Sequence, residues 1–299
     1  MPLRRTALAC LATLLLSSHA VASNDGQLCE NPLGLVLCGG LMAAEALTPQ
    51  SWPERMEKAV IAGQLDDLKR LADNHPQSVD AMNLLTLAAG NFTADAKNPD
   101  DRVAMLGYLL DKTTTSKDDP RMATMIEAIA ASRSPRRVEA LNLWFTRGVS
   151  AKGVSLAERA IGWGPDGPQV LRLLVQHGAN PNFSRAGAEP PLMQALRTRN
   201  FGSAQLLIEL GADPDAPLGT GEPSSLMRLA STCGARAPCT SETLRMIEFL
   251  LAHGAEPNGR ARPDGDCITP LDMARWSHDA ALEALLLRYK ADPDFRCAR

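Results

Sequence analysis

The stretch Gly211-Ala212-Asp213-Pro214-Asp215 decides how this chain folds, because versions of it recur at nearly regular intervals. Related stretches begin 33 residues before it, 43 residues after it and a further 36 residues on. A fixed period near 33 residues indicates supersecondary units stacked one on another. The copies are Gly178-Ala179-Asn180-Pro181-Asn182, Gly254-Ala255-Glu256-Pro257-Asn258 and, more weakly, Lys290-Ala291-Asp292-Pro293-Asp294.

Each copy closes an apolar run with helical spacing, such as residues 246–251 before Gly254. The motif has the chemistry of a helix end. Glycine accepts the left-handed conformation just beyond the last turn, and proline two or three residues later prevents the helix from resuming. The Asn or Asp side chains supply hydrogen-bond acceptors for the turn that follows.

The helix starts share a second pattern, which is clearest at Thr269-Pro270-Leu271. There Thr269 can cap the helix, Pro270 suits the first helical position, and Leu271 should point inward. From the leucine to the closing position is 19 residues in two copies, counted from Leu192 to Gly211 and from Leu271 to Lys290. The other starts are Pro190-Pro191-Leu192, Ser224-Ser225-Leu226 and Val154-Ser155-Leu156.

Thr-Pro-Leu followed after nineteen residues by the closing motif, on a period near 33, resembles the ankyrin repeat. The resemblance covers residues 153–297 and extends in weaker form from residue 53. It implies an all-α repeat solenoid, in which stacked ankyrin-type helix pairs are joined by β-hairpin-like loops. The sequence departs from the family at the histidine after Thr-Pro-Leu, where Asp272, Met193 and Met227 stand, and at Lys290, which replaces the closing glycine.

The chain begins with a segment typical of an export signal. A basic start is followed by an apolar run and then by the small-x-small sequence Ala20-Val21-Ala22. We expect a signal peptide at 1–22, cleaved after Ala22, and a periplasmic mature protein; a buried N-terminal helix is the alternative. Residues 23–52 are interpreted as an N-terminal cap, 53–152 as degenerate repeats in three helix pairs, and 153–299 as about four clear repeats with a C-terminal cap.

The mature chain would keep six cysteines, an even number that suggests disulfides in an exported protein. Six cysteines allow 15 pairings, and proximity in the sequence favours pairing neighbours; reduced, buried cysteines are the alternative. The favoured pairs are Cys29–Cys38, Cys233–Cys239 and Cys267–Cys297. The second pair lies in an insertion of nine residues between the two helices of the sixth repeat, which also carries Arg236. This loop is either a contact for a partner or a tolerated surface insertion.

Charge and motifs argue against several classes of function. Without residues 1–22 the net charge is −5, so nucleic acid is not an expected partner, and no polybasic membrane anchor is present. Residues 162–167 match G-x-G-x-x-G, but a helix precedes them and Pro165 removes a backbone donor, so we interpret them as a turn. No catalytic motif is found, and we expect no enzyme activity, no cofactor and no metal.

The resemblance implies that a partner would meet the loops and the exposed face of each first helix. The fifth and sixth positions after the leading leucine give Ile161, Arg197, Thr198, Trp276 and Ser277, and the loop position before it gives Glu189. Trp276 is the best-supported candidate, because tryptophan is enriched at binding hot spots. Further candidates by residue type are Trp163, Phe183, Arg185, Arg236, Arg260 and Arg262.

These features together predict an exported, non-enzymatic protein that is monomeric when unbound and holds another protein on its concave face. The most specific hypothesis is an immunity protein that inhibits a toxic antibacterial effector enzyme, such as a lipase or a cell-wall hydrolase. A periplasmic chaperone or stress factor for an envelope enzyme and a general envelope scaffold are the alternatives. An enzyme with a site in the inserted loops would need a catalytic constellation that the sequence does not offer.

Overall fold

A computed structural model describes residues 51–93, 98–156, 165–215, 223–233, 238–259 and 268–295. The chain divides into two units, Met1–Ser51 and Trp52–Arg299, and every helix described below belongs to the second. The expected signal peptide and almost all of the expected N-terminal cap lie outside the described residues.

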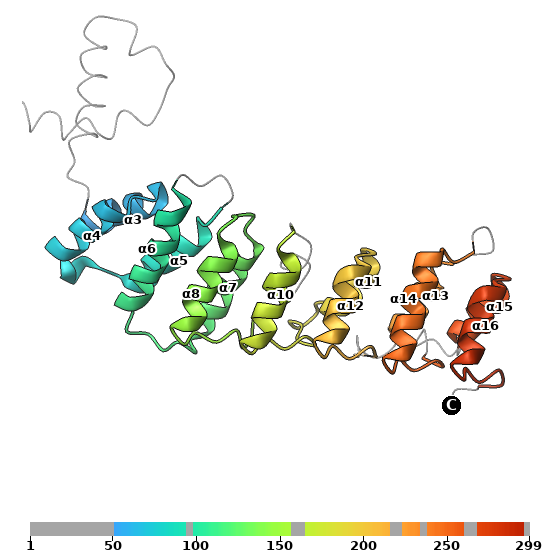
Figure 1. The fold of residues 1–299 in the computed structure, drawn as a ribbon. Coiled ribbons are helices and arrows are strands. Elements are labelled where there is room, and N and C mark those ends of the chain that lie inside the picture. Colours follow the sequence, from blue (N-terminus) through green and yellow to red (C-terminus); the bar gives the residue numbers. More distant parts are fainter. Residues whose placement is uncertain are drawn as a thin grey trace, which may run out of the picture. The chain divides into compact units, whose positions relative to one another are not determined.

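The described part of the second unit is built from helix pairs, as the sequence predicts (Figure 1). It contains no β-strand, only an isolated bridge residue at Ile268, and the described parts of the loops between helices are turns and irregular backbone. The first three pairs are α3 (Trp52–Ala62) with α4 (Leu65–Asn74), α5 (Ala81–Gly90) with α6 (Pro99–Lys112), and α7 (Pro120–Ala131) with α8 (Arg137–Thr146). The later helices are α10 (Gly167–Gln176), then α11 (Pro191–Arg197) with α12 (Phe201–Glu209), α13 (Ser225–Ala230) with α14 (Ser241–Ala252), and α15 (Pro270–Trp276) with α16 (Ala280–Arg288); a short 3-10 helix, η2 (Pro76–Ser78), follows α4.

Like helices stack on like helices. The first helices contact one another in the orders α3–α5–α7 and α11–α13–α15, and the second helices in the orders α4–α6–α8–α10 and α12–α14–α16. The leading leucine of each clear repeat is buried, at Leu156, Leu192, Leu226 and Leu271. Each repeat therefore buries its apolar face mainly against its neighbours, and the all-α repeat solenoid is confirmed.

The repeated motif ends helices in the way its sequence predicts. Gly178, Gly211 and Gly254 have φ values of 102°, 92° and 95°, in the left-handed region. At Gly211 the N–H donates to the Ile208 carbonyl (2.9 Å), and the next N–H, of Ala212, reaches back to the Leu207 carbonyl (2.8 Å). This pair of bonds is the Schellman arrangement, and it satisfies carbonyls that the helix leaves unpaired.

Lys290 adopts the same conformation without being glycine. Its φ is 65°, and its N–H donates to the Leu287 carbonyl (3.0 Å) while that of Ala291 donates to Leu286 (3.0 Å). A side chain in the left-handed region is unfavourable. The hydrogen-bonding pattern therefore persists in the last repeat at some conformational cost.

The Asx residues of the motif link neighbouring repeats, which the sequence analysis did not anticipate. The last residue of each copy accepts a hydrogen bond from the third residue of the next copy. The Asp213 N–H donates to Oδ1 of Asn182 (2.8 Å) and the Glu256 N–H donates to Oδ2 of Asp215 (2.6 Å). The Asp292 N–H then donates to Oδ1 of Asn258 (2.9 Å), so one bond type joins four successive copies.

A buried guanidinium connects α8 to α10. The side chain of Arg137 is 1% exposed; its Nε and Nη2 donate to the two carboxylate oxygens of Asp166 (2.7 Å each), and Nη1 donates to the Ala130 and Ser132 carbonyls (2.9 and 3.0 Å). These hydrogen bonds from Arg137 hold the pKa of the Asp166 carboxyl below its ordinary value. The arrangement ties the third helix pair to the helix that follows it.

The linking position can be tested at Asp215, because Asn stands at the equivalent positions 182 and 258. Asp215→Ala should lower the free energy of unfolding by about 1 kcal/mol, since the Glu256 N–H loses its acceptor. Asp215→Asn keeps an acceptor oxygen and should be no less stable than the wild type at pH 7. Urea unfolding of the three proteins measures both effects.

The same series should depend on pH. Burial raises the pKa of the Asp215 carboxyl, the Glu256 N–H opposes this, and the charges of Asp213 and Glu256 add to the rise. A raised folded-state pKa means that ionisation of Asp215 costs stability at neutral pH, and that this cost disappears as the pH falls toward 4. Any advantage of Asp215→Asn should therefore shrink on acidification; an advantage that grows would contradict this account.

Arg137 and its neighbour Arg136 form a matched pair for a second test. Arg137→Ala should cost about 3 kcal/mol, because it leaves one partner of a largely buried ion pair and two carbonyls without donors. The Arg136 side chain is 44% exposed and pairs with Asp100 and Glu139 at the surface, so Arg136→Ala should cost at most about 1 kcal/mol. Denaturant unfolding that gave equal losses would contradict the structural role of Arg137.

Candidate protein-binding surface

The candidate surface is formed by the ends of the first helices and the turns beside them, in the repeats from α11 to α16. In α15 the N-cap Thr269 and Asp272 form a capping box, with Pro270 at the first helical position and Leu271 buried, as predicted. This short, well-capped helix ends at Trp276, whose side chain is 60% exposed. Trp276 is thus presented by a rigid element.

Ser277 is not available to a partner, contrary to the expectation. Its side chain is buried, and its hydroxyl donates to the Ala274 carbonyl (3.1 Å). The chain turns inward directly after Trp276, because Asp279 must reach the N-terminus of α16 as its cap. Thr198 holds the matching position after α11; it is exposed, and its hydroxyl donates to the Gln194 carbonyl (2.9 Å).

Glu189 and Arg197 belong to one charged cluster that joins two repeats. One carboxylate oxygen of Glu189 accepts from Nε of Arg197 (3.0 Å), and the other lies 3.1 Å from Nη2 of Arg228 on α13. The Arg197 side chain is 52% exposed, whereas those of Arg228 and Glu189 are 23% and 20% exposed. The cluster therefore holds one exposed guanidinium in a defined place.

The other two described candidates lie in the loop before α11. Arg185 is exposed and pairs with Glu127 of α7 (2.7 Å), which lies 58 positions earlier in the chain. Phe183 is half-buried, and its N–H donates to the Asn180 carbonyl (3.0 Å), so it is partly committed to the loop. Arg185 is the more accessible of the two.

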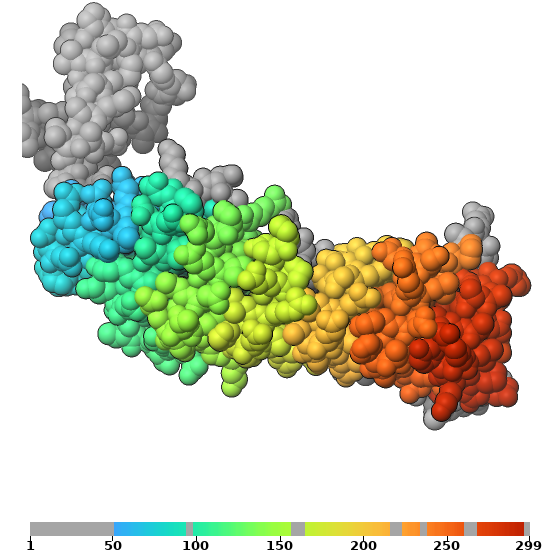
Figure 2. All heavy atoms as spheres, viewed as in Figure 1, coloured from blue at the N-terminus to red at the C-terminus, as the bar shows by residue number. Residues whose placement is uncertain are grey.

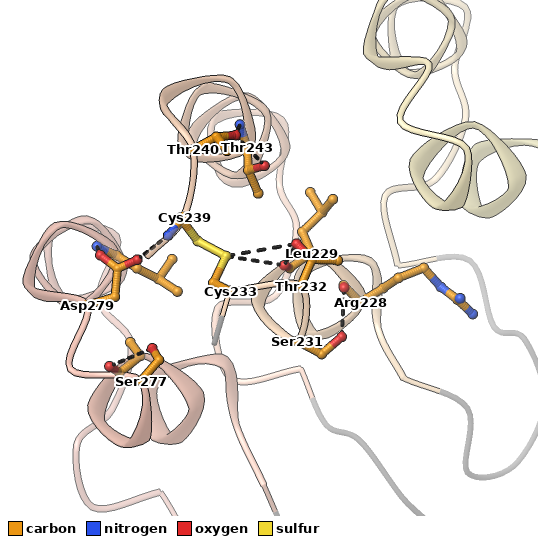
Figure 3. Close-up of a disulfide and its surroundings, with 12 residues drawn as sticks. Arg228, Leu229, Ser231, Thr232, Cys233, Cys239, Thr240, Thr243, Ser277 and Asp279 are labelled. Atoms are coloured by element: carbon orange, nitrogen blue, oxygen red, sulfur yellow. Dashed lines mark hydrogen bonds between the residues drawn. A yellow bond between two sulfur atoms is a disulfide. The ribbon is translucent and has the colours of Figure 1, made fainter. Parts of the chain in front are cut away.

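A disulfide and a buried carboxylate organise the end of the surface nearest Trp276 (Figure 3). Cys233 is bonded to Cys239, with their Cα atoms 4.7 Å apart. The Cys239 N–H donates to Oδ2 of Asp279 in the next repeat (2.7 Å), and Oδ1 of Asp279 accepts from the Leu282 N–H as the cap of α16 (3.0 Å). The insertion is thus attached to the repeat that carries Trp276.

The insertion is distributed differently from the sequence expectation. The connection between α13 and α14 runs over 231–240, whereas the one between α11 and α12 runs over 198–200. The second helix is also longer, with 12 residues in α14 against 9 in α12. The prediction that all nine extra residues lie between the helices is therefore wrong, because part of them extends α14.

Arg199 is a connecting residue that the sequence analysis missed. It has a φ of 58° in the turn after α11, and its Nη2 donates to the hydroxyls of Thr240 and Thr243 (3.3 and 3.1 Å). Thr240 in turn caps α14. The Ser/Thr caps are visible in the sequence, but nothing there indicates that an arginine from the preceding repeat donates to them.

Several predicted residues lie outside the described part of the chain. These are Ile161, Trp163, Arg236, Arg260 and Arg262, and the cysteines Cys29, Cys38, Cys267 and Cys297. Of the G-x-G-x-x-G match, Pro165, Asp166 and Gly167 are described: Pro165 lies in a turn, Asp166 pairs with Arg137, and Gly167 begins α10.

Two of the described histidines, His177 and His253, stack on aromatic rings. His177 stacks on Phe145 with ring centroids 4.2 Å apart, and His253 stacks on Phe249 at 4.0 Å. Nδ1 of His253 lies 2.8 Å from the Phe249 carbonyl at the end of α14. Among the described residues, no three His, Cys, Asp or Glu side chains are grouped to hold a metal ion. In the same residues, no helix combines the length and apolar character that a membrane crossing needs.

Comparison with known proteins gives matches to ankyrin-repeat proteins, although no family model matches the chain. The human ankyrin repeat and MYND domain-containing protein 1 is 33% identical over 87 residues, which is 29% of this chain and 9% of that protein. Human cyclin-dependent kinase inhibitor 2A is 37% identical over 81 residues, or 27% of this chain and 39% of the relative. The chain thus matches less than half the length of these relatives.

Among solved structures, the ankyrin repeat domain of Bcl-3, a member of the IkappaB family, aligns with a TM-score of 0.56 and 20% identity. The alignment covers 78% of this chain and 97% of that domain, and it supports the fold. Neighbouring repeats form successive bands of surface in Figure 2, a layout on which side chains from several repeats can contribute to one interface. Helix pairs, closing motifs and the structural neighbour agree that this chain has an ankyrin-repeat fold, and parts of its sequence are similar to ankyrin-repeat proteins.

Proposed function

We propose that the chain binds one protein partner through the first-helix ends and adjoining turns of its later repeats. The observation that carries this proposal is Trp276, an indole that is 60% exposed at the end of a capped helix. Burying an exposed indole in a partner's pocket yields a large gain in binding free energy, and the entropic cost is limited because the helix already orders the backbone that carries the side chain.

Two exposed arginines in earlier repeats, each held by a carboxylate, support a charged partner surface in addition to the apolar contact at Trp276. Arg197 is held by Glu189, so its exposed guanidinium loses little freedom when a carboxylate of a partner approaches it. Arg185, 57% exposed and held by Glu127, supplies a second such position in the loop before α11. Acidic side chains at the edge of the partner's interface would pair with both guanidinium groups.

Two further features make the proposal more specific: export to the periplasm and an enzyme as the partner. The N-terminal sequence supports export and the periplasm, and a stacked, preformed surface suits tight inhibition of an enzyme. We therefore propose an immunity protein that binds and blocks a toxic effector enzyme delivered between bacteria, such as a lipase or a cell-wall hydrolase. A chaperone or stress factor for an envelope enzyme would use the same surface but would preserve the activity of its partner.

Trp276→Ala tests the contact, with Leu287→Ala as the matched control. Leu287 is also an exposed apolar residue, 42% exposed, but it lies on the second helix of the same repeat. Titration calorimetry with the partner isolated on the wild-type chain should show at least tenfold weaker binding for Trp276→Ala and unchanged binding for Leu287→Ala. Both variants should unfold within about 0.5 kcal/mol of the wild type; unchanged binding by Trp276→Ala would exclude this contact.

Deletion of the gene tests the immunity role. Cells that lack the protein should die beside siblings that deliver the cognate toxin, and the wild-type chain should rescue them, whereas Trp276→Ala at equal abundance should not. Normal growth of the deletion strain beside toxin-producing siblings would overturn the immunity proposal. A purified partner whose activity is preserved rather than blocked would favour the chaperone alternative, and many faint partners in a periplasmic pull-down would favour a scaffold.

A further inference from the structure

The segment from Cys239 to Thr243 is the point at which three successive repeats are joined. Arg199 of the preceding repeat donates to the hydroxyls of Thr240 and Thr243, and Thr240 caps α14 of its own repeat. The Cys239 N–H donates to Asp279 of the following repeat. Residues 239–243 therefore make hydrogen bonds to the preceding repeat, to the following repeat and within their own repeat.

The Asp279 carboxylate depends on this segment. The residue is 4% exposed, so solvent offers its carboxylate little hydration. Oδ1 accepts from the Leu282 N–H at the start of α16, and Oδ2 accepts from the Cys239 N–H at 2.7 Å (Figure 3). Losing a hydrogen-bond donor therefore costs more free energy at a buried carboxylate than at an exposed one, because water cannot replace the lost bond.

The disulfide holds the donor in place. Cys233, which is 2% exposed, follows the end of α13, and its bond to Cys239 fixes the far end of the insertion beside Asp279. Without this covalent link, the Cys239 N–H would be positioned only by the start of α14 and the contacts of Arg199, with no direct connection to the end of α13. The last described repeat has no described helix pair on its other side, and end repeats depend strongly on the contacts that remain.

We propose that the Cys233–Cys239 disulfide is a redox-controlled lock on the α15–α16 repeat, acting through the Cys239 N–H and the Asp279 carboxylate. When the disulfide is intact, the turn that follows Trp276 is held. When it is reduced, Asp279 loses a donor, the cap of α16 weakens, and the turn that follows Trp276 loosens. This inference concerns the fold itself and does not depend on the proposed partner.

A dithiol is the reductant that the step requires. A thiolate of the dithiol attacks the sulfur of Cys239, which belongs to the less buried residue of the pair, and the Cys233 thiolate leaves and takes up a proton. The second thiol of the reagent then attacks the mixed disulfide, releasing Cys239 as a thiol and closing the disulfide of the reagent. The protein gains two electrons and two protons, and the dithiol loses them.

Hydrogen–deuterium exchange of the full chain, with and without dithiothreitol, tests the lock. Reduction should speed exchange of the α16 amides by about tenfold, while amides of α3 and α4 stay unchanged. In the double variant Cys233→Ser/Cys239→Ser, the α16 amides should exchange fast from the start and should not respond to the reagent. This control separates the lock from any other disulfide in the chain.

Asp279→Asn tests whether reduction of the disulfide acts on α16 through the hydrogen bond from the Cys239 N–H to Asp279. The amide oxygen can still cap α16, but the amide nitrogen cannot accept from the Cys239 N–H, so this variant should exchange like the reduced wild type and show no further response to reduction. Asn200→Ala, which removes the equivalent cap of α12, should leave the response of α16 to reduction intact. A disulfide that resists dithiothreitol in the folded protein, equal α16 exchange before and after its reduction, or a full response in the double variant would each overturn the proposal.

Discussion

The hydrogen bond from a backbone N–H in one closing motif to the Asx side chain of the preceding motif is the contact on which the clear repeats depend. It occurs at Asn182, Asp215 and Asn258, with lengths from 2.6 to 2.9 Å. The bond needs the preceding helix to end at a defined residue, which the left-handed glycine ensures. Helix termination and repeat register are therefore specified by the same five residues.

The candidate surface uses the opposite end of each first helix. There the connections vary in length, and the structure compensates with polar links between repeats: Arg199 to Thr240 and Thr243, and the Cys239 N–H to Asp279. These contacts hold exposed side chains such as Trp276 in defined places. A surface arranged in this way suits recognition of another folded protein.

The two ends of the helix pairs therefore have different roles. At the closing motifs the same contact is repeated with little variation, because every repeat must sit in the same register on its neighbour. At the turns between helices each link uses different residues, and length can change without disturbing the register. The insertion that carries the disulfide and the candidates Arg197, Thr198 and Trp276 lie at this second end, whereas Phe183, Arg185 and Glu189 lie in the loop between a closing motif and α11.

The sequence determined the local features: the helix ends at Gly178, Gly211 and Gly254, the capping box at Thr269, the buried leading leucines and the repeat period. Each of these follows from the backbone preferences of a few adjacent residues, and so it could be predicted without a structure. Pairings between residues far apart were decided only by the tertiary structure. Arg137 pairs with Asp166, Arg199 donates to two threonines, and the Ser277 side chain is buried. These contacts depend on how one repeat packs on the next.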